Sequence, residues 1–169
     1  MMKILAIDPG NKESGVAIIK MPDFGLLWFA KLPNEDVCKV VNIRDFDEVA
    51  IEMIACYGMP VGKTVFETCL WIGRFIEQLK EHKISFVYRN EEKMHLCGSA
   101  RAKDSNIRQA LVNRYAEFDF KSGKGTKKQP DVFYGVSKDV WQAISVGVTH
   151  YEKLHNGFEE VVCGKTKHD

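Results

Sequence analysis

The chain has 169 residues, of which 45% are hydrophobic and 28% charged, enough to bury the core of a single domain. Its formal net charge of +1 neither indicates nor excludes nucleic acid as a partner, because a local basic face can lie within a balanced total. No apolar run is long enough to cross a membrane and no signal peptide opens the chain, so we expect a soluble, cytoplasmic protein with no membrane partner.

Short apolar runs predict the β-strands of one sheet. Turn residues separate the first three runs so closely that we expect tight hairpins and antiparallel pairing. A helical pattern separates the fourth run from the fifth, as in strands that pair in parallel across a crossover helix. The five predicted strands cover residues 3–8, 15–19, 26–31, 49–52 and 84–88.

Apolar residues at helical spacing predict three helices. The first lies between the last two strands, the second starts at Asp104 or Ser105, either of which can cap it, and the third starts near Ser137. Gly147 in the third helix would let that helix pack closely on the sheet. These elements predict a mixed α/β fold in one domain spanning residues 1–169. The predicted buried face of the first helix consists of Val65, Cys69, Ile72, Ile76 and Leu79.

Carboxylates stand where they could form one site. Asp8 ends the first strand and is followed by Pro9-Gly10, so little side-chain bulk blocks an approaching metal or phosphate. Glu52 ends the fourth strand and would leave the sheet at the same edge if the two strands are parallel neighbours. Asp139 lies in the first turn of the third helix, and Gln142 shares its face. Each also fits an ordinary turn, strand end or helix start, so only the trio in this order predicts a site.

A cluster of three carboxylates predicts a metal-dependent reaction. Like charges repel unless cations neutralise them, and hard oxygen ligands select Mg²⁺, for which Mn²⁺ can substitute. Such a site suits two-metal phosphodiester hydrolysis, in which one ion activates water and the other stabilises the leaving oxygen. His150 lies on a similar helix face but roughly 16 Å along the axis, too far to share a metal with Asp139.

Basic residues and one aromatic residue are candidates for contact with nucleic acid. The segment 121–128 is rich in lysine and glycine and is predicted to be a loop, and basic residues between positions 101 and 108 add charge nearby in sequence. Tyr57 is predicted in an exposed loop beside the acidic residues, where it could stack on a base or pack on the domain surface.

Other patterns predict less. Residues 58–64 look like a Walker A loop, but only three residues separate the glycines where the phosphate cradle needs four, and Pro60 stiffens the loop. We therefore expect no nucleotide cofactor. The five cysteines include no C-x-x-C pair, so we expect reduced thiols, several of them buried, rather than disulfides or a zinc site.

The order of motifs resembles that of the RuvC-type Holliday junction resolvases, a family of the ribonuclease H-like superfamily. Ile7-Asp8-Pro9-Gly10 with Gly15-Val16-Ala17 is similar to the opening motif, and Ala50-Ile51-Glu52 to the second acidic strand end. Residues 139–150 resemble the last helix, and residues 98–103 the small-residue and lysine segment before the second long helix. The match covers nearly the whole chain, whose divergent sequence looks like that of a phage or prophage member.

The resemblance implies a ribonuclease H-like fold, with a five-stranded mixed sheet flanked by helices, and a homodimer that resolves four-way DNA junctions by paired Mg²⁺-dependent nicks. It implies that Asp8, Glu52 and Asp139 are catalytic metal ligands. The family usually has an acid at the position of Gln142, whose amide oxygen can still bind a metal but carries no charge, and Asp131 could supply the missing acid. The charge pattern and the resemblance assign DNA contact to Tyr57, Lys63, Arg101, Lys103, Arg108, Lys124, Lys127 and Lys128.

Three alternatives stay open. The same fold and metals would serve the hydrolysis of RNA in RNA–DNA hybrids. The chain could also bind junctions without cutting them, with Gln142 as the mark of a disabled site. An actin-like phosphotransferase, whose first hairpin also carries an aspartate followed by glycines, would need two lobes, and this chain has residues for one.

Overall fold

The computed structural model describes the backbone of residues 1–163 and the side chains of residues 1–155. Its five strands form one sheet in the order β3-β2-β1-β4-β5, with the first three antiparallel and β4 and β5 parallel to β1. This arrangement confirms the predicted mixed sheet and its two hairpins. The strands are β1 (Met2–Asp8), β2 (Glu13–Met21), β3 (Gly25–Pro33), β4 (Glu48–Met53) and β5 (Lys83–Tyr88).

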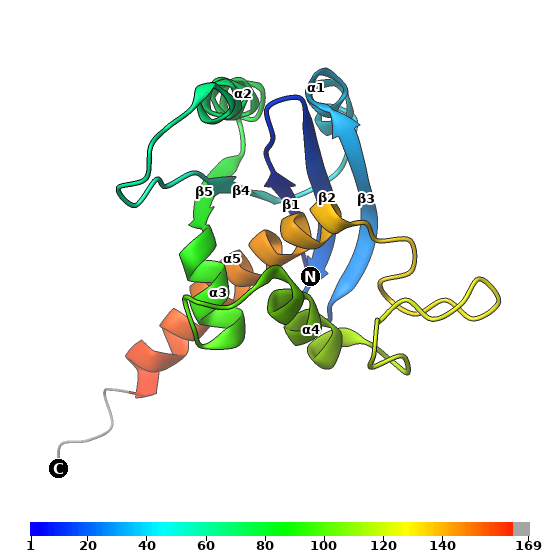
Figure 1. Ribbon diagram of the computed structural model, residues 1–169. Coiled ribbons are helices and arrows are strands. Elements are labelled where there is room, and N and C mark those ends of the chain that lie inside the picture. The colour runs from blue at the N-terminus through cyan, green and yellow to red at the C-terminus, as the bar shows by residue number, and fades with distance from the viewer. Residues whose placement is uncertain (164–169) are drawn as a thin grey trace, which may run out of the picture.

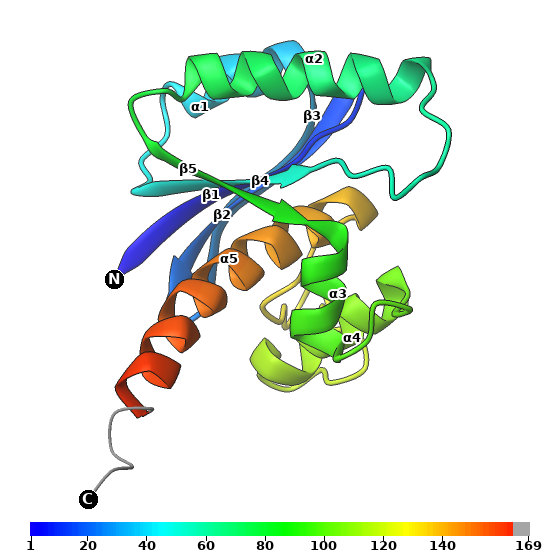
Figure 2. The ribbon, with the colours of Figure 1, turned by 90° about the vertical axis from the view of Figure 1, so that its left-hand side faces the viewer.

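Helices cover both faces of the sheet (Figures 1 and 2). Because side chains alternate along a strand, Leu5 and Ile7 of β1 pack under the helices of one face and Ile4 under those of the other. The first face carries α1 (Asn34–Val41) and α2 (Lys63–Gln78). On the second face α5 (Lys138–Cys163) lies directly on the sheet, with α3 (Arg89–Cys97) and α4 (Asp104–Tyr115) beside it.

The buried face of α2 differs from the predicted one. Thr68, Ile72, Phe75 and Leu79 face the sheet, whereas Cys69 is exposed. Thr68 can be buried because its hydroxyl donates to the carbonyl of Thr64 at 2.8 Å, and this rotation of the helix places the large Phe75 ring in the core. The expectation of buried cysteines is also wrong for the described side chains, since Cys38, Cys56 and Cys97 are only half-buried. Cys163 lies outside the described side chains.

The starts of α4 and α5 can be compared with the sequence predictions. The predicted start of α4 at Asp104 is confirmed, but neither Asp104 nor Ser105 caps it; the Asn106 side chain accepts the backbone N–H of Lys103, the residue before the helix, at 2.9 Å. The start of α5 near Ser137 is confirmed, because the Ser137 carbonyl accepts the N–H of Trp141 at 3.1 Å. Close packing at Gly147 is also confirmed: a Cβ there would lie 2.8 Å from Ile19 Cδ1. None of the helices within residues 1–163 is long and apolar enough to cross a membrane.

The connection between α4 and α5 is a loop that projects from the domain (Figure 1), as predicted for residues 121–128. Two buried or half-buried carboxylates organise it. Asp119 accepts the backbone N–H groups of Ser122 and Gly125, and Asp131 accepts those of Glu117 and other residues that follow α4. The basic tip of the loop is therefore carried on a base with satisfied hydrogen bonds.

Candidate active site

Parallel pairing gathers the ends of three neighbouring strands at one edge of the sheet. Ile7 pairs with Ile51 and Met53 pairs with Tyr88, so β1, β4 and β5 end side by side. Asp8 and Glu52 each follow this Ile7–Ile51 pair by one residue, so they lie next to each other on neighbouring strands. The structure thus brings these two predicted site residues together.

Both carboxyl groups hold their protons more tightly than usual. Burial, and then the negative charge of Glu52, raise the pKa of Asp8 to about 9. Burial also raises the pKa of Glu52, against the opposing effect of the positive charge of Arg89. A divalent cation would remove this repulsion, and carboxylate oxygens are the ligands that Mg²⁺ and Mn²⁺ prefer. The pair therefore fits a hard divalent ion.

Asp139 reaches the same pocket across Gly15. Gly15 of β2 pairs with Asp8 on one side and with Lys31 of β3 on the other, and the first turn of α5 lies directly over it. A Cβ at Gly15 would stand 2.3 Å from the carbonyl oxygen of Asp139. Asp139 Oδ2 lies 2.6 Å from Lys31 Nζ. Together with residues 9–13, these four residues line a pocket of about 380 Å³.

The three carboxylates do not form a single metal-binding cluster. Among the side chains that the structure describes, no three His, Cys, Asp or Glu groups are arranged to hold a metal ion. Asp8 and Glu52 are together, whereas Asp139 shares the pocket but is paired with Lys31. Asp131 cannot supply a missing acid, because its carboxylate accepts backbone N–H groups of the projecting loop; that prediction is wrong.

An ionic network beside the acidic pair was not predicted. Arg89, whose side chain is 22% exposed, contacts Glu92 Oε2 at 3.2 Å and also donates to Gln142 Oε1 and Asp104 Oδ1. Glu92 is fully buried, and burial together with the charge of Glu52 raises its pKa to about 8. The position of Arg89 and Glu92 just after β5 was the available signal, because that strand ends beside Glu52 of β4.

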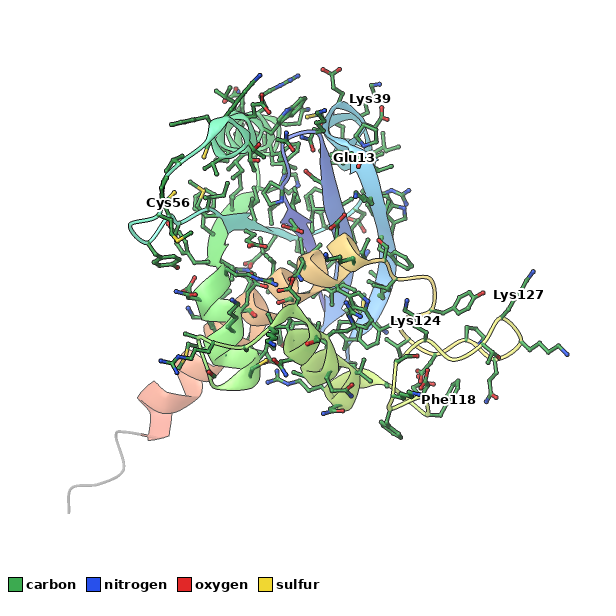
Figure 3. The ribbon with its side chains drawn as sticks, in the orientation of Figure 1. Glu13, Lys39, Cys56, Phe118, Lys124 and Lys127 are labelled. Carbon is green, nitrogen blue, oxygen red and sulfur yellow. The ribbon has the colours of Figure 1, made fainter. Side chains whose placement is uncertain are left out.

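The candidate DNA-contacting residues lie on three segments. Lys103 and Arg101 precede α4 next to Asp104, which Arg89 holds, so this segment adjoins Arg89. Tyr57 is exposed in the loop between β4 and α2, as predicted, and Lys63 begins α2. The remaining candidates are Arg108, which lies over the ring of Trp141, and Lys124, Lys127 and Lys128 on the projecting loop (Figure 3).

His150 lies away from the acidic pair, as its place along the helix predicted. Its Nε2 is 2.9 Å from Glu48 Oε2, at the start of β4 rather than at its end. The side chain is nearly fully buried. His150 therefore belongs to the packing of α5 on the sheet.

Comparison with known proteins shows the fold. No protein-family profile and no curated protein sequence matches the chain. The fold matches that of RuvC from Thermus thermophilus in complex with a Holliday junction substrate, with a TM-score of 0.71, 13% identity, and coverage of 93% of this chain and 97% of that chain. A second structure of Thermus thermophilus RuvC gives a TM-score of 0.69, 15% identity, and coverage of 92% and 97%.

A viral resolvase has the same fold. The Fowlpox virus resolvase, solved with Holliday junction DNA, matches with a TM-score of 0.53 and 16% identity over 89% of this chain and 99% of that chain. The resemblance to RuvC-type resolvases read from the motifs is thus confirmed at the level of the fold. The predicted five-stranded, ribonuclease H-like architecture is confirmed with it.

Proposed function

We propose that this chain is a metal-dependent endonuclease that nicks four-way or otherwise branched DNA. The observation that carries the proposal is the Asp8–Glu52 pair, which stands at the edge of the sheet beside an open pocket. The fold adds support, since Thermus thermophilus RuvC and the Fowlpox virus resolvase were solved with Holliday junction DNA. Paired carboxylates of raised pKa in a pocket are typical of sites that bind cations and hydrolyse phosphodiesters.

Residues of the pocket have separate parts in this proposal. Asp8 and Glu52 would hold Mg²⁺ or Mn²⁺, which supplies a more acidic water and positive charge for the leaving oxygen. Pro9 and Gly10 leave room for the DNA backbone to reach Asp8. Asp139 accepts a hydrogen bond from Lys31 and thereby keeps the Lys31 ammonium in the pocket, where it can contact a phosphate oxygen.

Branched DNA would be held by basic residues outside the pocket. Arg101 and Lys103 precede Asp104, which Arg89 holds, and the projecting loop carries Lys127 away from the domain (Figure 3). Such contacts to phosphate position DNA without reading its sequence. We include Tyr57, Lys63 and Arg108 as further contacts on the same grounds of exposure and charge.

The proposed active form is a homodimer, with one site for each cut strand. Phe66, Leu70 and Gly73 follow one another at helical spacing on the outer side of α2, and Phe66 and Leu70 are 61% and 72% exposed. We call these three residues the α2 stripe. Large apolar side chains gathered on one helix face are typical of a surface that a second copy covers. A symmetric dimer across α2 would bury the stripe of each copy.

The proposal is tested by cleavage of a synthetic four-way junction in Mg²⁺, in Mn²⁺ and in EDTA, with duplex DNA and an RNA–DNA hybrid as other substrates. We expect paired nicks in the junction that require a divalent ion and disappear in Asp8→Asn. Asp36→Asn is the matched control, because Asp36 pairs with Lys39 on α1, on the other face of the sheet. Binding without nicking in either metal would contradict the enzyme and indicate a junction-binding protein; cleavage of the hybrid alone would indicate a ribonuclease H.

A further inference from the structure

The guanidinium of Arg89 is fixed beside the acidic pair. It contacts Glu92 at 3.2 Å and is also hydrogen-bonded to Gln142 and Asp104. These three partners belong to three different helices, α3, α5 and α4. Only 22% of its side-chain surface is exposed. An arginine held by three acceptors on separate elements cannot swing into solvent as a surface arginine does.

Glu92 explains why this arginine stays in place. Its side chain is fully buried, Ser145 donates to its Oε2, and its Oε1 has no hydrogen-bond partner among the described residues. Its Oε2 accepts from both Arg89 and Ser145, and because the side chain is enclosed in the core it cannot move away from the guanidinium. Glu92 is therefore a positioning residue for Arg89.

The side-chain amide oxygen of Gln142 faces Arg89. Sequence reasoning assigned its amide oxygen to metal binding, in place of the acid that the resemblance implies at this position. In the structure that oxygen accepts from the guanidinium. An amide suits this contact, because it offers an acceptor to Arg89 without adding negative charge that would draw a second cation. Asp139, the third carboxylate, is likewise occupied by the cation of Lys31.

We propose that Arg89 is a built-in cation of the active site that takes the place of one of two divalent ions, so that each chain binds a single ion, at Asp8 and Glu52. The inference rests on the proposed metal-dependent function. Glu52 pairs with Val87 and Met53 with Tyr88, so Arg89 directly follows the end of β5 that lies beside Glu52 at the end of β4. A fixed guanidinium stabilises negative charge on a phosphate without having to be bound from solution.

The test counts bound Mn²⁺ by electron paramagnetic resonance, without DNA. We expect one ion per wild-type chain, lost in Asp8→Asn. Gln142→Asp should still bind one ion, because the new carboxylate pairs with Arg89. Arg89→Gln/Gln142→Asp should bind two, and the matched variant Arg89→Lys/Gln142→Asp, which retains the positive charge, should bind one. Mere loss of structure lowers the number of bound ions, so a gain on removing Arg89 is not a folding effect.

Two outcomes would overturn the inference. The first is a count of two ions per wild-type chain, both lost in Asp8→Asn. This outcome does not depend on whether the variants of Arg89 and Gln142 fold. The other is a second ion in Gln142→Asp alone, which would show that Arg89 does not exclude it. Junction cleavage is measured separately. One bound ion without cleavage would support the inference and contradict the proposed nuclease. Cleavage with two bound ions would support the nuclease and contradict the inference.

Discussion

At the scale of single residues, Asp8 should make the folded protein progressively less stable as pH rises from about 4 to about 9 when no divalent ion is bound. An aspartate in an unfolded chain has a pKa near 3.9, whereas burial and the charge of Glu52 raise the pKa of Asp8 to about 9. Between these values the folded chain keeps a proton that the unfolded chain releases. The free energy of unfolding should therefore fall as pH rises, by up to about 1.4 kcal/mol per pH unit. Denaturant titrations in EDTA measure this slope, which Asp8→Asn should flatten.

Asp131 serves as a control, because its pKa in the folded chain is lowered where that of Asp8 is raised. Despite burial, hydrogen bonds from the backbone of Glu117, Asp119 and Phe118 lower the pKa of Asp131 to about 2. Its contribution to stability is present at neutral pH and is lost only as pH falls below the unfolded pKa toward 2. Asp131→Asn should thus weaken the fold at neutral pH and leave the slope above pH 5 intact. An unchanged slope in Asp8→Asn would contradict the raised pKa of Asp8 in the folded chain.

Sequence alone could place some of these residues and not others. Asp8 and Glu52 follow apolar strands, and parallel pairing brings the ends of neighbouring strands together whatever the loops do. Arg89 and Glu92 lie in a hydrophilic segment whose helix has no apolar pattern, so nothing local marks them as buried. Their burial depends on α5 supplying Ser145 and Gln142, contacts between residues 53 positions apart.

At the scale of elements, the active site depends on how closely the first turn of α5 approaches β2. In Gly15→Ala the new Cβ would meet the backbone of Asp139, at 2.3 Å from its oxygen, so the turn itself must move. We expect a loss of about 1–3 kcal/mol of stability, and a fall of about 100-fold in the rate of nicking, because Asp139 and the Lys31 that it holds leave their places. Thermal unfolding and single-turnover cleavage measure the two effects.

Gly147→Ala is the matched variant on the same helix. Its Cβ would meet Ile19 Cδ1 at 2.8 Å, the end of a side chain that can rotate, and Ala6 Cβ at 3.1 Å, so the helix must also shift slightly away from β1. This variant should lose stability to a similar or smaller degree but keep most of its activity. Equal losses of activity in the two variants would mean that the position of the first turn of α5 does not matter to the chemistry.

The same scale shows where helical periodicity misleads. The predicted and observed buried faces of α2 share two residues and differ by a small rotation of the helix. The predicted face is Val65-Cys69-Ile72-Ile76-Leu79 and the observed face is Thr68-Ile72-Phe75-Leu79. Periodicity favoured the first because it counted a threonine as polar. The hydrogen bond from Thr68 to the Thr64 carbonyl satisfies its hydroxyl within the helix, which no apolar count can register.

At the scale of the whole molecule, the projecting loop should supply part of the salt dependence of DNA binding. Removing one lysine that binds a phosphate reduces the log–log dependence of affinity on salt by about 0.9. Lys127→Gln/Lys128→Gln should therefore flatten that dependence for a four-way junction, measured by fluorescence anisotropy. Lys39→Gln/Lys80→Gln removes the same charge from the face of α1 and α2 and should change little. An equal effect of the two double variants would show that the projecting loop does not contact the DNA.

The fold was predictable from sequence because its order of elements is strongly constrained: two hairpins and one crossover admit few sheets. The resemblance implied a homodimer but not the surface through which it would form, since the spacing that predicted a buried face of α2 did not show which residues would remain exposed. Only after the rotation of α2 is known do Phe66, Leu70 and Gly73 stand out as a single apolar stripe. The dimer is therefore the prediction that depends most on the structure.

Phe66→Glu and Leu70→Glu should convert the dimer to monomers without unfolding the chain, because both side chains are exposed and a charge there costs little in the monomer. Sedimentation equilibrium measures the change in mass. Phe120→Glu, at another exposed phenylalanine, should leave the dimer intact. Since one chain carries one site, the monomeric variants should still nick a junction but should make the two cuts independently, so that singly nicked junctions accumulate. A dimer that persists in both variants would place the second copy elsewhere than on α2.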